Sequence, residues 1–489
     1  MAVGVVGWGP VVALGALAAW LGWRSRAWPL VHDAPIMHYI AWRMADGAVP
    51  YRDLFDMNFP GTYLLHLAVL ALLGPGDAAW RVFDLLWLAA GAAAVAALAA
   101  TWGSVAATGG ALFFVAHHLA GGAWQAGQRD FLLCPLLLAG ALGVARWLEQ
   151  PGRLAGLAWG GLALGAGLTI KPHVGLLAAA LAGLVARRAD RPERRRALAL
   201  FGAGLAAAPL AVVGWLAAAG ALPAWRAIVL DYLIPLYSRL GWPAEWGFHR
   251  WPVWIPIALA MVLSVGAAVV HRRFGPRHAV AVVGVLYGVV HYVGQGKGWE
   301  YHLYPLAAFA AVLLFSELPA LLAAGRWLAG GLIAVSLAAG LAGLAAKGAE
   351  AADAADSGWI ADKQRRVQAV VGALAGRLGP EDRVQGLDTA EGGVHALLRL
   401  GAVAPTRFLY DFHFFHDVDT PMVQALRREL LDGLQARPPR FIVLFARGWP
   451  AGGYERLDLF PELQRFLTAR YRLEQEADGF RIYAKRDDP

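Results

Sequence analysis

The sequence predicts a polytopic α-helical membrane protein that ends in a soluble α/β domain. Of its 489 residues, 58% are hydrophobic and only 16% are charged, whereas soluble globular chains carry about 25% charged residues. Residues 1–345 are a series of apolar runs with short polar breaks, and runs of about 18–22 residues are long enough to cross a hydrocarbon core as helices. From Trp359 onward the spacing of the apolar residues changes to that of the helices and strands of a soluble domain.

Eleven membrane-spanning helices are expected in this first part of the chain. Abundant alanine and glycine would let their backbones approach closely in a bundle. Residues 63–73 are apolar but short, which favours a helix lying in the membrane interface. The spans are predicted at residues 3–23, 80–100, 104–121, 131–148, 154–170, 173–187, 198–219, 253–271, 278–294, 302–318 and 326–346.

The orientation follows from the two most basic short loops, residues 187–196 and 271–278. Such loops face the cytoplasm, and counting spans from them places the N-terminus inside and the C-terminal segment outside. This predicts a multi-pass protein of the cell (inner) membrane with its C-terminal domain in the periplasm. The loops predicted to share that outer face are residues 24–79, 122–130, 171–172, 220–252 and 295–301.

Two domains are predicted, a membrane module at residues 1–346 and a soluble domain at residues 347–489. In the soluble part, strand-like runs alternate with helical stretches, which indicates a small mixed sheet. It has no glycine-rich loop of the kind that binds nucleotide phosphates. Helices are expected near residues 360–378, 420–436 and 460–470, and strands at 383–387, 407–412, 440–445 and 480–484.

Cysteine content and net charge exclude several classes of function. The single cysteine, Cys134, lies in an apolar run, so neither a disulfide framework nor a thiolate metal site is expected. A net charge of +8 would suggest nucleic acid as the partner of a soluble protein. Here the basic residues lie largely in the loops that orient the spans. The expected partners therefore include membrane lipids and no nucleic acid.

Polar side chains gather on the predicted outer face. Ionisable groups near a membrane are costly, so their position is informative. A set of carboxylates, cations and imidazoles at one membrane surface suits the binding of a phosphorylated lipid headgroup, although simple solvation of outer loops accounts for part of it. The candidate site residues are Asp33, Arg52, Asp53, Asp56, Arg129, Asp130, Lys171, Lys297 and His302.

The first outer loop carries a more specific pattern. Residues 32–39 read HDAPIMHY, and residues 45–61 read ADGAVPYRDLFDMNFPG. An acid after the first span, followed by a G-x-x-P-Y-x-D run, resembles the first outer loop of the GT-C glycosyltransferases. The similarity is greatest to the bacterial branch that includes protein mannosyltransferases and the aminoarabinose transferase of lipid A.

The resemblance implies an enzyme that transfers a sugar from a polyprenyl-phosphate donor to an envelope lipid, glycan or protein acceptor on the outer face. Asp33 matches the acidic position and would be the catalytic base or a ligand of a divalent metal cation, the one cofactor expected. As a base for an acceptor hydroxyl it is expected to have a raised pKa. The resemblance also suggests a single displacement with inversion.

Two positions depart from the family pattern. Ala34 replaces a second acid, so the base or metal role depends on Asp33 alone. Asn58 lies where a phosphate-binding lysine is common, so the donor phosphate needs another cation. The candidates are Arg52, Arg129, Lys171 and Lys297.

Two other functional classes stay open at the level of sequence. A transporter or lipid flippase would show inverted repeats and ionisable groups near the membrane midplane. Here charges within the spans are sparse, with Asp84 and His291 the clearest. An assembly scaffold would work through the C-terminal domain and would not need Asp33.

Overall fold

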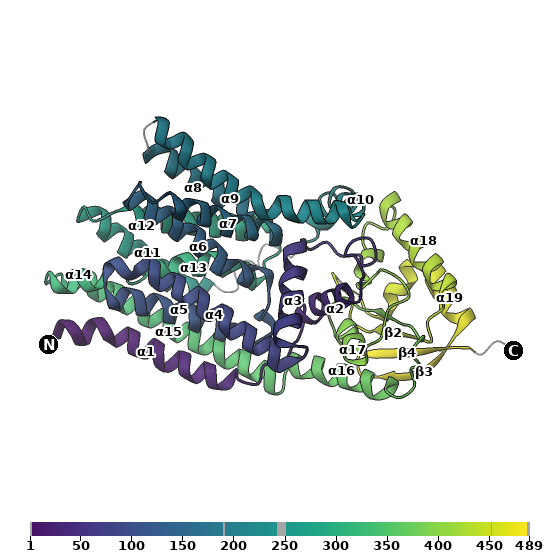
Figure 1. Ribbon diagram of the computed structural model, residues 1–489. Helices are drawn as coiled ribbons and strands as arrows, with labels where there is room; N and C mark the ends of the chain where they lie inside the picture. The colour runs from purple at the N-terminus through teal and green to yellow at the C-terminus, as the bar shows by residue number, and fades with distance from the viewer. Residues whose placement is uncertain (1, 189–190, 242–250, 451, 487–489) are drawn as a thin grey trace.

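The computed structural model describes residues 2–188, 191–241, 251–450 and 452–486. It consists of a long helical bundle joined to a smaller α/β domain (Figure 1). The N-terminus lies at one end of the bundle, and the C-terminal domain adjoins the other end. The predicted fold class, a helical membrane bundle with a C-terminal α/β domain, is confirmed.

Every predicted span overlaps a helix, although the one at residues 302–318 overlaps mainly the ten-residue α13, which ends in a turn. Seven of the helices in the described residues are long and apolar enough to cross a membrane, and the total of eleven spans stays a prediction. The last of these helices continues to Asp356, beyond the predicted end of its span at residue 346. The helices that match the spans are α1 (Ala2–Arg24), α4 (Asp77–Ala99), α5 (Ser104–Gly121), α6 (Arg129–Glu149), α7 (Leu154–Ile170), α8 (Val174–Arg188), α9 (Arg191–Ala218), α11 (Trp251–Val270), α12 (Pro276–Gln295), α13 (Tyr304–Leu313) and α15 (Trp327–Asp356).

Small residues bring the helices of the bundle close together. A Cβ added at Gly161 of α7 would lie 2.2 Å from the carbonyl oxygen of Phe201 in α9, and one at Gly165 would lie 2.4 Å from that of Leu205. Any side chain at these glycines would push the two helices apart, which is the close approach expected of small-residue interfaces in membranes.

Two short helices lie between the bundle and the C-terminal domain. These are α2 (Ala34–Ala45) and α3 (Pro60–Leu73), and α3 runs across the end of the bundle (Figure 1). After α9 the chain forms the short helix α10 (Leu222–Ala227), which is followed by a π-helix at Ile228–Leu233. After α13 the chain turns into the short α14 (Leu318–Ala323).

The C-terminal domain has the predicted mixed sheet, with strand order β1-β2-β4-β3. Strands β1 and β2 are parallel, and the other two pairs are antiparallel. Its elements are α16 (Trp359–Leu374), β1 (Val384–Leu387), α17 (Gly393–Leu400), α18 (Pro421–Ala436), β2 (Phe441–Phe445), α19 (Pro461–Arg470), β3 (Tyr471–Ala477) and β4 (Phe480–Lys485).

One strand prediction is wrong, and one strand of the structure was not predicted. Residues 407–412 were expected to be a strand, but this segment pairs with the first outer loop instead. The N–H of Phe55 donates to the carbonyl of Arg407 at 2.7 Å, and Phe408 makes an isolated bridge to Phe55. Strand β3 was not predicted because it is a largely exposed edge strand with charged residues in place of an apolar alternation.

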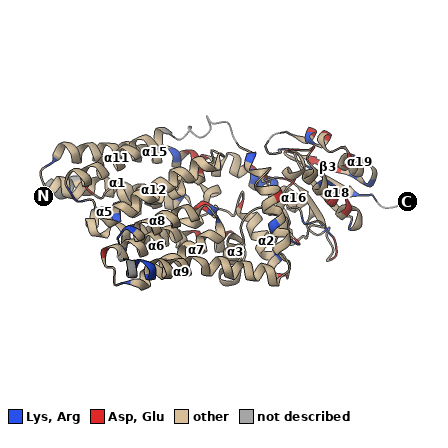
Figure 2. Cartoon of the chain, turned by 90° about the horizontal axis from the view of Figure 1, so that it is seen from above, with Lys and Arg blue, Asp and Glu red and all other residues tan. Residues whose placement is uncertain are grey.

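Charged residues are unevenly distributed along the bundle. Figure 2 shows few along the middle of the bundle, whereas they gather at its junction with the C-terminal domain and at the opposite end near α9. The last residues of α8 and the first residues of α9 belong to the predicted basic loop 187–196, and these two helix ends lie at that opposite end (Figure 1). Residues 189–190 of this connection, and 242–250 of the predicted outer loop 220–252, lie outside the described residues.

Candidate active site

Asp33 lies at the junction between bundle and C-terminal domain, immediately before α2. The residue before it, His32, has a left-handed backbone with a φ of 65°, a conformation that costs about 1–3 kcal/mol for a residue other than glycine. The imidazole of His32 packs edge-on against Trp124 and Trp359, with ring centroids 5.7 Å away in both cases. Its Nδ1 accepts a hydrogen bond from Lys363 at 2.9 Å. These contacts fix the turn that presents Asp33.

The Asp33 carboxylate faces the first turn of α6. Its Oδ2 accepts from the side-chain amide of Gln128 at 3.1 Å and pairs with the guanidinium of Arg129 at 3.4 Å. The turn before α6 requires glycine at position 127, because its φ is 78° and a Cβ there would lie 2.1 Å from the Trp80 ring. Asp33 and Arg129, two residues predicted separately, therefore form one unit.

The structure corrects the expected pKa of Asp33. Burial alone would raise the pKa of this carboxyl, but His32, Arg129 and the Gln128 hydrogen bond together outweigh it and hold the pKa below its usual value. Asp33 is thus a carboxylate throughout the neutral range. The physical reason is the positive charge that His32 and Arg129 place beside the carboxylate, which favours its charged form.

Asp56 fixes the shape of the first outer loop. One oxygen of its buried carboxylate accepts from the backbone and side-chain amides of Asn58 at 2.6 and 2.8 Å, and from the Tyr63 hydroxyl at 2.7 Å. Burial raises its pKa, which these hydrogen bonds only partly oppose. Its second oxygen has no hydrogen-bond partner among the described residues.

Asp130 and Lys171 form a buried network next to this unit. The Lys171 ammonium is 2.8 Å from one oxygen of Asp130 and donates to Gln295 at 2.7 Å. The other oxygen of Asp130 is 2.5 Å from Nε2 of His291, and Nε2 of His302 lies 4.0 Å from the oxygen that Lys171 contacts. The charge of Lys171 is therefore already neutralised by Asp130, which makes it a weaker candidate for phosphate binding than the sequence suggested.

Lys297 contacts Tyr237, which lies in the connection between α9 and α11. Its ammonium donates to the carbonyl of Tyr237 at 2.8 Å and lies 4.4 Å from the centre of the Tyr237 ring. Burial lowers the pKa of this lysine to about 8. No acid pairs with it among the described residues, so Lys297 keeps a cationic charge that a ligand could use.

Arg52 and Asp53 lie on the surface and pair with each other. The Arg52 guanidinium contacts the Asp53 carboxylate at 2.8 Å and also donates to the carbonyl of Ala219 at 3.1 Å. Asp53 in turn accepts from the N–H of Val49 at 2.8 Å. The structure does not bring this pair into contact with Asp33, and its interactions hold the loop in place.

Several groups around Asp33 come from distant parts of the chain and carried no sequence signal. The Arg129 guanidinium lies over the ring of Tyr301, 5.9 Å from its centre. Burial, followed by the charges of Asp33 and Asp56, raises the pKa of Tyr410 in the C-terminal domain, so these groups share one electrostatic environment. Lys363, which holds His32, likewise belongs to the C-terminal part.

Metal-binding groups are not clustered here. No three His, Cys, Asp or Glu side chains within the described residues are placed to hold an ion. The nearest cation to Asp33 is the Arg129 guanidinium at 3.4 Å, which competes for the carboxylate.

No family model matches the sequence, and no curated protein does. Solved structures do match. ArnT from Cupriavidus metallidurans, bound to undecaprenyl phosphate, superposes with a TM-score of 0.61 at 15% identity, over 98% of this chain and 98% of that one. The chain has the GT-C fold.

The same GT-C fold accounts for matches to a second enzyme. The Archaeoglobus fulgidus oligosaccharyltransferase tethered to an acceptor peptide has a TM-score of 0.53 at 12% identity, over 98% of this chain and 74% of that one. A further structure of that archaeal enzyme, in complex with Zn and sulfate, has a TM-score of 0.50 at 12% identity, over 90% of this chain and 68% of that one. These likenesses cover nearly the whole chain and not only the first outer loop.

Proposed function

We propose that the chain is an integral membrane glycosyltransferase that takes a sugar from a polyprenyl-phosphate donor and transfers it to a lipid, glycan or protein acceptor. The observation that carries the proposal is the Asp33–Arg129 pair, 3.4 Å apart at the end of a GT-C bundle. It puts a carboxylate and a cation side by side, as transfer from a sugar phosphate requires.

In the proposed reaction the Asp33 carboxylate accepts the proton of the acceptor hydroxyl. The acceptor oxygen bonds to the anomeric carbon as the bond from that carbon to the phosphate oxygen breaks, so the configuration is inverted. Arg129 takes up the charge that develops on the departing polyprenyl phosphate. Sharing its guanidinium with that phosphate would loosen its pair with Asp33, and the carboxylate would become a stronger base.

The direct test is transfer in a purified system. The full-length protein in detergent is given a polyprenyl-phosphate carrying a radiolabelled sugar and an extract of envelope lipids and glycans. Label moving from donor to acceptor supports the proposal. Label that stays on the donor across acceptor classes, with a protein that still binds the donor, contradicts it.

Arg129 is expected to contribute to donor binding. Arg129→Gln should weaken binding of a polyprenyl phosphate by about 1–3 kcal/mol, the range for a hydrogen bond to a charged group. Lys171→Met should have a smaller effect, because Asp130 already neutralises that ammonium. Isothermal titration of the purified protein measures both, and Lys297→Met tests the remaining cation. Unchanged affinity in all three variants would remove these residues from the phosphate site.

A divalent metal at Asp33 is not part of the proposed chemistry. The archaeal oligosaccharyltransferase has been solved with Zn, but the donor set here fits a resident metal poorly. Asp33 is flanked by the amide of Gln128 and the cation Arg129, and its oxygen lies 3.7 Å from Nε2 of His32. The proposed steps use protein groups alone.

A transporter is less well supported. Its ionisable groups would lie near the midplane, whereas Asp33, Arg129 and their neighbours lie where the bundle meets the C-terminal domain. The ionisable residues deeper in the helices are paired: Asp84 with Arg81 and His118, and His291 with Asp130.

We also propose that the C-terminal domain and Asp33 face the periplasm. In a background with Cys134 replaced, a cysteine at the exposed Asp419 should react with an impermeant thiol reagent in intact cells. A cysteine at the exposed Arg188, at the other end of the bundle, should react only after lysis. The reverse labelling pattern would overturn the orientation while leaving the fold unaffected.

A further inference from the structure

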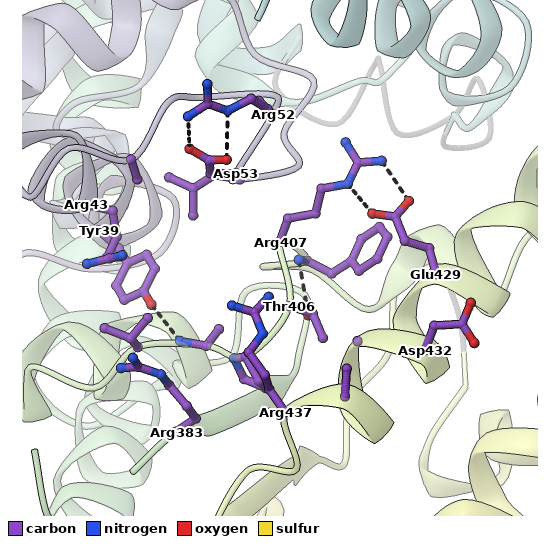
Figure 3. A pocket seen from close by; sticks show the side chains of 18 of the residues that line it. Tyr39, Arg43, Arg52, Asp53, Arg383, Thr406, Arg407, Glu429, Asp432 and Arg437 are labelled. Carbon is purple, nitrogen blue, oxygen red and sulfur yellow. Dashed lines mark hydrogen bonds and ion pairs between the residues drawn. The ribbon is translucent and has the colours of Figure 1, made fainter. Parts of the chain in front are cut away.

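A pocket lies between the first outer loop and the C-terminal domain (Figure 3). Its volume is about 960 Å³. One wall is formed by α2 and residues 46–54, and the other by residues 403–408 and α18. Neither Asp33 nor Arg129 lines it, so it is distinct from the candidate active site.

The lining of this pocket is rich in arginine. Six arginines and four acids contribute to it. Three of the arginines are paired within the wall, which accounts for three of the acids. These pairs are Arg43 with Asp46 at 2.9 Å, Arg52 with Asp53 at 2.8 Å and Arg407 with Glu429 at 2.5 Å.

The other three arginines, Arg383, Arg428 and Arg437, have no acidic partner among the described residues. Figure 3 shows Arg383 and Arg437 in the lower part of the pocket, with no dashed line to an acid. Guanidinium groups are planar forks that bind phosphate or carboxylate oxygens in pairs. Arg428 and Arg437 are exposed and Arg383 is half-buried, so their guanidinium groups are accessible to a ligand. Asp432 is the one lining acid without an arginine partner among the described residues.

The pocket also lies close to the end of a membrane span. Arg52 of its wall donates to the carbonyl of Ala219 at 3.1 Å, directly after α9 ends at Ala218. The wall is thereby connected to the level where a helix leaves the bundle, which is where lipid headgroups lie around a membrane protein. A phosphorylated headgroup and a soluble oligophosphate could both reach it.

We infer that this pocket is a binding site for a ligand with two or more phosphate groups, held by Arg383, Arg428 and Arg437. The site is separate from sugar transfer and does not depend on it. A bound polyanion would neutralise the three arginines and contact α18 and the first outer loop at once. It would therefore also stabilise the contact between the bundle and the C-terminal domain.

Two phosphorylated probes test the inference on the full-length protein. Pyrophosphate is titrated calorimetrically in detergent, and cardiolipin, which carries two phosphates, is offered in nanodiscs and its retention measured after purification. The triple variant Arg383→Gln, Arg428→Gln and Arg437→Gln should lose at least roughly tenfold in affinity for the probe that binds. The matched control carries Arg447→Gln, Arg465→Gln and Arg470→Gln, which remove equal charge from the same domain outside the pocket, and should bind like wild type.

The probes separate the two ligand sources. If the triple variant loses cardiolipin retention and the control does not, the ligand is a lipid headgroup. If the triple variant loses pyrophosphate binding and the control does not, the ligand is a soluble oligophosphate. Binding of neither probe to the wild type, or equal loss in the control, overturns the site. Asp33→Asn should bind the probes normally, so a failure of the proposed transfer reaction would leave this result unaffected.

Discussion

Asp33→Asn is expected to reduce sugar transfer by about 10²–10⁴, the contribution of a general base. Asparagine keeps the size of the side chain and can still meet the amide of Gln128, but it cannot accept a proton. It also removes the negative charge that pairs with Arg129 at 3.4 Å. The measurement is the initial rate of transfer from a polyprenyl-phosphate sugar by purified protein, with folding checked by thermal unfolding in detergent.

Asp458→Asn is the matched control for this variant. Asp458 is an exposed acid of the C-terminal domain, and its replacement removes the same charge without touching the junction. It should transfer sugar at the wild-type rate. A folded Asp33→Asn protein that also transfers sugar at that rate would show that Asp33 is not the base.

Asp130→Asn is expected to cost about 3–5 kcal/mol of stability, because it leaves a buried cation without its counter-charge. Asp130 is fully buried, and Lys171 lies 2.8 Å from it with a side chain only 12% exposed. The loss should appear as a lower unfolding temperature in detergent. A stability equal to that of wild type would contradict the pairing.

A second substitution separates this charge effect from simple loss of packing. Adding Lys171→Met to Asp130→Asn removes the stranded cation, and most of the lost stability should return. As a comparison, Glu149→Gln breaks the partly exposed pair of Glu149 with Arg277, 2.8 Å apart. Such a pair is worth about 1 kcal/mol or less, so that variant should unfold near the wild-type temperature.

The fold was predictable because run length and composition decide it. A run of apolar residues long enough to cross a membrane becomes a helix whatever its neighbours are, since backbone groups cannot stay unpaired in lipid. Asp33 was proposed as the catalytic residue for a different reason, because it matches a local motif of the first outer loop.

The electrostatics of the site could not be predicted from local sequence. Asp33 and Arg129 are 96 positions apart, and nothing near either residue shows that they meet. Burial alone would raise the pKa of this acid, whereas the neighbouring His32 and Arg129 together lower it. The neutralisation of Lys171 by Asp130, 41 positions away, was hidden for the same reason. Strand β3 was missed for a local reason, because its exposed charged residues give no apolar alternation.

The contacts between the first outer loop and the C-terminal domain determine when, during synthesis, that loop can complete its structure. The Tyr39 hydroxyl donates to the carbonyl of Ala402 and accepts from the N–H of Ala404, both at 3.2 Å. Tyr39 and Ala402 are 363 positions apart in the chain. The loop that carries Asp33 therefore leaves the ribosome long before its partners at residues 402–407 are made. Until then these two hydrogen bonds of Tyr39 cannot form, so the loop reaches its final arrangement only after this part of the C-terminal domain has been synthesised.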